Sequence, residues 1–271
     1  DALLELGHLN AASEALAAAD ERGAGELSVS ARRSRLAWLA GKLVPAREGM
    51  ESALAAAKAL GGESTEHVMW CLVQLGELHI RCGGFAQAER QYQSALELAP
   101  EHWSVLEHLA EVRGALGADE EATALFAKVA GTTGRPVVWQ ALRDWHLLQR
   151  RPEAAKAAHD RALAGYKESI DRGEMLYVHH LAGFYCDSQE NAEEAVKWAR
   201  KDLELRQGAA AWDALAWALY KKDEVEEALV MTKKALATET ADSHLLYHAG
   251  MIHFSAGQVG EGKRLLRKCA E

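Results

Sequence analysis

The sequence predicts an all-α protein built from repeated pairs of helices that stack on one another. Three observations support this fold class. Alanine and leucine recur at helical spacing throughout the 271 residues, whereas proline occurs only four times, a composition typical of helical proteins. One small residue returns about every 34 positions along the whole chain. A position suited to a tight turn precedes that small residue each time by five positions.

The recurring small residue defines the repeats. It occupies positions Ala12, Ala46, Ala88, Ala122, Ala155, Ala195, Ala228 and Gly262. The successive spacings are 34, 42, 34, 33, 40, 33 and 34, so five of the seven lie within one residue of 34. We expect extra loop residues to account for the two longer intervals, in the stretches 60–66 and 166–173, because both contain glycine and charged residues.

Each repeat has a predicted turn between its two helices. Glycine adopts the left-handed conformation that ends a helix without steric cost, and it occupies most of these turn positions. They are Gly7, Gly41, Gly83, Gly117, Arg150, Glu190, Asp223 and Gly257. Seven residues after the small residue a second small side chain recurs, at Ala19, Ala53, Ala95, Ala162 and Ala235. We expect the two small positions to let the helices approach closely.

The first helix of each repeat carries its apolar residues at offsets of three, four and seven, which places them on one helical stripe. Leu72, Leu75, Gly76 and His79 in one repeat correspond to Trp212, Leu215, Ala216 and Leu219 in another. A single helix pair cannot bury such a stripe by itself, so neighbouring pairs must stack.

The repeat formed by Leu72, Leu75, Gly76, Gly83, Ala88, Tyr92, Ala95 and Pro100 resembles a tetratricopeptide repeat from end to end. The resemblance covers essentially the whole chain and implies one solenoid over residues 1–271, a right-handed alpha-alpha superhelix of about eight helix pairs. The implied repeats span approximately residues 1–26, 27–60, 67–102, 103–135, 136–172, 174–208, 209–242 and 243–271, with the first and the last incomplete. The pattern departs from the family at Arg33, where leucine is expected, and at Arg143, where a small residue is expected.

Composition limits the partners and the setting of the chain. The formal net charge of −9 disfavours nucleic acid and anionic lipid as partners. No run reaches the length of an apolar membrane helix, so we expect no membrane insertion. The cysteines form no CxxC pair, which favours reduced thiols: Cys71, Cys82, Cys186 and Cys269. The chain begins without methionine and lacks polar capping helices, so a fragment of a longer protein is one interpretation, and its localisation stays open.

The resemblance implies that a partner binds the concave groove lined by the first helices of the repeats. The positions that project into it are acidic in the middle repeats and mostly aromatic toward the C-terminus. They are Glu77, Glu107, Glu111, Asp144, Tyr177, Phe184, Trp217, Tyr220, Tyr247, Met251 and Phe254. We expect a protein or peptide with basic residues at one end and apolar anchors at the other. Packing between repeats is the alternative for each aromatic residue, and a solvated helix face is the alternative for each acidic one.

We expect no catalytic residue, cofactor or metal. The sequence lacks a GxxxxGK[ST] loop, a strand-led GxGxxG and a GxSxG elbow. His244 and His248 share a helix face, but no glutamate follows His244 as a metalloprotease motif requires. We interpret three other histidines as planar packing residues: His79, His146 and His253. The adjacent rings of His179 and His180 point about 100° apart on a helix, which disfavours a shared ion.

These observations favour a non-catalytic scaffold for protein interactions. One alternative is the substrate-recruiting or regulatory part of a larger enzyme or signalling protein. Another is assembly of the chain into a homo-oligomer through its end repeats.

Overall fold

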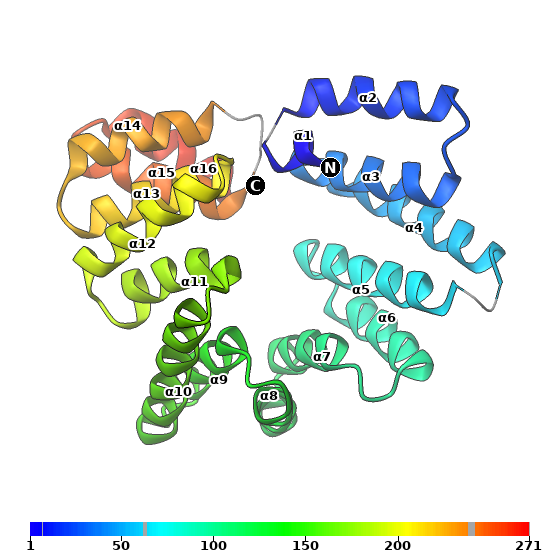
Figure 1. Ribbon diagram of the computed structural model, residues 1–271, viewed down its shortest axis with the longest axis horizontal. Coiled ribbons are helices and arrows are strands. Elements are labelled where there is room, and N and C mark those ends of the chain that lie inside the picture. Colours follow the sequence, from blue (N-terminus) through cyan, green and yellow to red (C-terminus); the bar gives the residue numbers. More distant parts are fainter. Residues whose placement is uncertain (7, 62–63, 238–241, 271) are drawn as a thin grey trace. The chain divides into compact units, whose positions relative to one another are not determined.

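The computed structural model describes residues 1–6, 8–61, 64–237 and 242–270, and these residues form helices joined by short turns (Figure 1). The described residues include no strand. Helices contact mainly the helices that precede and follow them in the chain. The predicted all-α solenoid of stacked helix pairs is therefore confirmed. Over the same residues, none of the helices combines the length and the apolar character needed to cross a membrane.

The contacts divide the chain into two compact units. Unit 1 comprises Asp1–Ala12, Leu39–Gly41 and Tyr166–Glu271, and unit 2 comprises Ser13–Trp38 and Lys42–Gly165. The helices of unit 2 are α2 (Leu9–Glu21) from Ser13 onward, α3 (Glu26–Leu39), α4 (Leu43–Ala59), α5 (Thr65–Arg81), α6 (Phe85–Leu98), α7 (Trp103–Ala115), α8 (Asp119–Thr133), α9 (Pro136–Leu148) and most of α10 (Pro152–Asp171).

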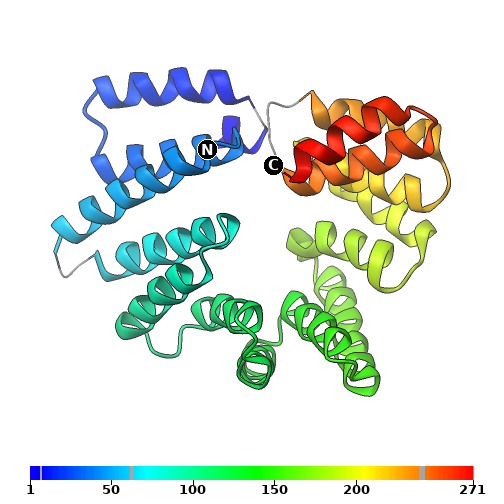
Figure 2. The ribbon, with the colours of Figure 1, turned by 180° about the vertical axis from the view of Figure 1, so that it is seen from behind.

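Unit 1 carries the C-terminal repeats. Its helices are α1 (Ala2–Glu5), the start of α2, the end of α10, the 3-10 helix η2 (Met175–Tyr177), α11 (Val178–Gly183), the π-helix η3 (Phe184–Ser188), α12 (Ala192–Leu205), α13 (Ala209–Lys221), α14 (Val225–Leu236), α15 (Ser243–Ser255) and α16 (Val259–Ala270). Figure 2 shows the last two helices, α15 and α16, lying along each other as one pair.

Small side chains allow the helices of a pair to approach closely. All eight recurring small residues of the sequence pattern are buried. In the pair α5 and α6, a Cβ atom added to Gly76 would lie 2.2 Å from the Cε1 atom of Tyr92. In the pair α15 and α16, a Cβ atom on Gly262 would lie 2.8 Å from the backbone oxygen of Gly250. These helices therefore pack at a distance that a larger side chain would prevent.

The predicted turns adopt the left-handed conformation. The seven that lie in the described residues all have φ between 50° and 81°: Gly41, Gly83, Gly117, Arg150, Glu190, Asp223 and Gly257. Gly7 lies outside the described residues. In the turn after α5, the amide N–H of Gly84 donates to the carbonyl of His79 at 2.8 Å, the bond that closes a helix with a left-handed residue. Three of these turns carry a residue other than glycine in this conformation: Arg150, Glu190 and Asp223.

One of the two predicted loop insertions is wrong over residues 166–171. Residues 166–171 continue α10, which extends to Asp171. No glycine or proline interrupts this stretch, and Tyr166 is buried with its ring centroid 5.5 Å from that of Phe184. Packing therefore keeps this stretch helical, although its charged residues and the glycine that follows it predicted a loop. In the other stretch, the helix α4 ends at Ala59 and α5 begins at Thr65, while residues 62 and 63 lie outside the described residues.

Replacing Gly76 with alanine is expected to lower the free energy of unfolding by about 1–3 kcal/mol, because the new Cβ overlaps the buried ring of Tyr92. Urea unfolding followed by circular dichroism measures the change. The matched control is Gly131→Ala in α8, where an added Cβ meets no atom within 4 Å. The control is expected to be neutral or to stabilise by about 0.5–1 kcal/mol, because alanine forms helices better than glycine. Equal losses in the two variants would contradict the close approach at Gly76.

Candidate partner-binding site

Five of the predicted groove residues lie together on two neighbouring helices of unit 1. Trp217 and Tyr220 are three positions apart on α13, and Tyr247, Met251 and Phe254 follow the same face of α15 at intervals of four and three. These five residues are called the aromatic surface below. Tyr247 is 43% exposed and Phe254 is 48% exposed, so both offer apolar area to another molecule.

Trp217 is the buried base of the aromatic surface. Its ring centroid lies 5.0 Å from that of Tyr220 and 6.1 Å from that of Tyr247. Its indole Nε1 donates a hydrogen bond to a carboxylate oxygen of Asp187 at 3.2 Å, and Lys221 forms an ion pair with the same carboxylate at 3.2 Å. The indole is therefore held in one orientation, and the rings of Tyr220 and Tyr247 rest against a rigid side chain.

Two other predicted groove residues do not reach a surface. Phe184 is fully buried and Tyr177 is buried, and both pack in unit 1 against Tyr166, with ring centroids 5.5 Å and 6.0 Å from it. For these two residues the structure agrees with packing, which was the alternative to partner binding. The sequence analysis placed loop residues from 166 onward, whereas Tyr166 belongs to α10 and packs against both rings.

The predicted acidic residues of unit 2 each have a cationic neighbour in the chain itself. Glu107 pairs with Arg135, with 3.1 Å between Oε2 and Nη1, and Asp144 pairs with Arg143 at 2.5 Å. Burial raises the pKa of Glu107, although the charge of Arg135 acts in the opposite direction. These contacts compensate much of the negative charge that the sequence pattern placed in the groove.

His108 on α7 contacts the two remaining acidic residues of the predicted groove, Glu77 and Glu111. Its Nε2 lies 3.2 Å from Oε1 of Glu77, and its Nδ1 lies 3.4 Å from Oε2 of Glu111. Burial by itself would lower the pKa of His108, but the hydrogen bonds and charges of the two carboxylates outweigh it and raise the pKa to about 10. The ring also stacks on Tyr92 with 5.6 Å between centroids. Sequence reasoning missed His108, although its position between two groove glutamates on one helix was a usable signal.

The four cysteines are free thiols, as expected from their spacing. Burial raises the pKa of Cys71 to about 11 and that of Cys186 to about 12. Both thiols are therefore protonated near neutral pH, which makes them poor nucleophiles.

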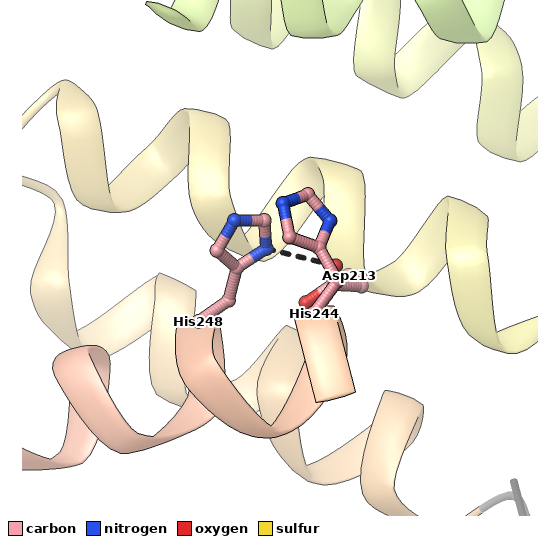
Figure 3. Close-up of side chains that lie close together, drawn as sticks. All are labelled: Asp213, His244 and His248. Atoms are coloured by element: carbon pink, nitrogen blue, oxygen red, sulfur yellow. Dashed lines mark hydrogen bonds and ion pairs between the residues drawn. The ribbon is translucent and has the colours of Figure 1, made fainter. Parts of the chain in front are cut away.

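One group of side chains in unit 1 has the composition of a metal site. Asp213 on α13 accepts a hydrogen bond from His248 on α15, with 2.9 Å between Oδ2 and Nδ1. His244 lies one helical turn before His248 (Figure 3). Asp213 and His248 are buried, whereas His244 is exposed. The sequence pattern identified the two histidines but missed Asp213, which lies 35 positions before His248.

The ring of His108 is expected to remain protonated at about pH 8.5, where a histidine with the ordinary pKa of about 6.5 is neutral. NMR titration of the ring nitrogens measures this. His79 is the control, because burial and the nearby charge of Arg47 lower its pKa, so its ring is neutral at that pH.

The raised pKa of His108 also makes the stability of the fold depend on pH. The folded pKa of His108 lies above its unfolded value, so its stabilisation is fully present below about pH 6.5 and is lost as the pH rises through about 10. The difference in unfolding free energy between the native chain and His108→Gln should therefore shrink over that range. A His108 ring that titrates near its ordinary pKa would contradict both expectations.

Comparison with known proteins places the fold. No family model matches the sequence, and no curated protein matches it. Among solved structures, yeast Tom70 matches with a TM-score of 0.52 and 13% identity over 92% of this chain and 61% of that chain. The APC/C hetero-tetramer Cut9-Hcn1 matches with a TM-score of 0.52 and 12% identity over 95% of this chain and 55% of that chain.

A third match is a tetratricopeptide repeat protein from Parabacteroides merdae ATCC 43184, with a TM-score of 0.48 and 17% identity over 91% of this chain and 99% of that chain. At identities this low, likeness between structures speaks to the fold and not to the activity. The paired helices, the left-handed turns and the matches to Tom70 and Cut9-Hcn1 together show that this chain has the fold of tetratricopeptide repeat proteins.

Proposed function

We propose that the chain is a scaffold that binds another protein, and that the aromatic surface of unit 1 holds the partner. The observation that carries this proposal is the exposure of Tyr247 and Phe254 on α15, where the ring of Tyr247 lies 6.1 Å from the fixed ring of Trp217. Single exposed apolar residues are common on protein surfaces. A group of aromatic residues on a rigid base is typical of the centre of a protein interface.

The fold supports a protein as the partner. Structural matches to tetratricopeptide repeat proteins favour an interaction scaffold in general, and Cut9 in the matched structure is part of a hetero-tetramer with Hcn1. The first helix of each stacked repeat has one face that does not pack against the neighbouring pairs. Helices α13 and α15 are first helices of this kind. We infer that a peptide or a helix lies along these first-helix faces.

The partner's chemistry follows from the side chains that remain available. The aromatic surface suits apolar anchors, because burying an aromatic side chain supplies most of the energy at an interface. In unit 2, Glu111 and Asp144 are about half exposed, at 49% and 50%, and are the members of the acidic set most open to a basic side chain. Their neighbours His108 and Arg143 reduce that attraction, so we place the binding energy in the aromatic surface.

Replacing both Tyr247 and Phe254 with alanine is expected to weaken binding of the native partner by about 2 kcal/mol or more, which is roughly thirtyfold. Affinity capture from the organism's own lysate, quantified by mass spectrometry, identifies proteins held by the native chain. Titration with the purified partner then measures the affinity.

The matched control is the double variant Val230→Ala and Val259→Ala. These residues are exposed to a similar extent, at 49% and 41%, but lie on the second helices α14 and α16. A partner lost by the first variant and kept by the control supports the proposal. Equal affinity for the native chain and the first variant would contradict it.

A further inference from the structure

Three side chains from two helices of unit 1 converge beside the aromatic surface. One ligand atom each from Asp213, His244 and His248 lies within 4.8 Å of the other two. Oδ2 of Asp213 is 2.9 Å from Nδ1 of His248, and the ring centroids of the two histidines are 4.2 Å apart. Figure 3 shows the two imidazoles beside the carboxylate, with both histidines projecting from the same helix.

We propose that Asp213, His244 and His248 form a binding site for one zinc ion. Two imidazole nitrogens and one carboxylate oxygen are a ligand set that zinc takes in proteins, with the fourth tetrahedral position left for water. Imidazole ligands favour zinc and related transition metals over magnesium and calcium, which prefer oxygen ligands alone. Zinc bonds of about 2.0–2.2 Å place the ligand atoms roughly 3.3 Å apart. The ligand atoms lie within 4.8 Å of one another, so they must draw closer around the ion. Zinc binding also releases to water the proton that the coordinating nitrogen of His248 carries.

The buried part of the site is held in place before any ion arrives. The ring of His248 stacks on Trp217 with 4.0 Å between centroids and 10° between planes. Trp217 is in turn fixed by its hydrogen bond to Asp187. Outer contacts of this kind orient a ligand ring and strengthen metal binding, because less freedom is lost when the ion binds.

Packing alone explains only part of the arrangement. A buried carboxylate needs a hydrogen-bond partner, and His248 supplies one for Asp213. That pair accounts for two of the three residues. His244 is exposed and is not needed to satisfy the pair, yet its ring lies directly against His248. Its exposure leaves the site open to solvent on one side, which gives an ion an entry path and leaves room for a bound water.

The site belongs to the chain alone and does not depend on the proposed partner. Calorimetric titration of ZnCl₂ into the full chain, freed of metal by a chelator, tests it. We expect one zinc ion per chain. Substituting cobalt for zinc is expected to produce the visible absorption bands of a tetrahedral site, and zinc is expected to raise the melting temperature of the native chain.

Two variants and one control assign the ligands. His244→Ala removes an exposed ligand and leaves the buried pair intact, so the variant retains the fold. Asp213→Asn keeps the shape of the side chain and removes its charge. Each is expected to weaken zinc binding by about tenfold or more. The control is His180→Ala on α11, an exposed histidine of the same unit that lies next to His179, and its zinc affinity should equal that of the native chain.

Absence of zinc binding to the native chain would overturn the proposal. Unchanged affinity in His244→Ala, or a loss of affinity in His180→Ala as large as in His244→Ala, would also overturn it, because the ion would then lie elsewhere. Unchanged affinity in Asp213→Asn would overturn the assignment of the carboxylate as a ligand.

Discussion

The close approach of the two helices in each pair is the constraint on which the rest of this structure depends. Gly76 against the ring of Tyr92, and Gly262 against the backbone of Gly250, leave no room for a further carbon atom. A pair packed this closely buries one face of each helix and leaves another apolar face uncovered. The next pair covers it, as Val105 and Leu109 of α7 do when they join the core around Tyr92. Repetition of this step builds the solenoid.

The same stacking decides which first-helix residues reach the surface. Where the chain follows the regular repeat, as in α15, the free-face residues Tyr247 and Phe254 remain exposed. Where it departs from the regular repeat, the outcome differs. The longer α10 brings Tyr166 against Phe184, and the π-helix η3 lies in the same stretch. Tyr177 and Phe184, which lie at groove positions of this stretch, are therefore buried and not available to a partner.

Carboxylates buried between helices are repeatedly paired with histidines of a neighbouring helix. Asp213 pairs with His248 across α13 and α15, and Asp202 on α12 pairs with His179 on α11 at 2.8 Å. Burial tends to raise the pKa of Asp202, but hydrogen bonds from His179 and Arg206 outweigh it and lower the pKa. Removing a carboxylate from water is costly without such partners. The pairing thus permits polar groups inside the stack, and where a second histidine joins it, the arrangement also has the ligands of a metal site.

The sequence by itself determined the pairing of helices. The repeat period of about 34 residues located the small residues at the helix contacts and the left-handed turns, because these features are local to one repeat. The turns include those at Arg150, Glu190 and Asp223. It also identified the first-helix positions that include Tyr247 and Phe254. The extent of α10, the burial of Tyr177 and Phe184, and the cations beside the acidic residues were decided only by the tertiary structure. Each of these depends on side chains from another helix, such as Asp213 at 35 positions from His248, and their approach is set by packing between helices, which no spacing within one helix encodes.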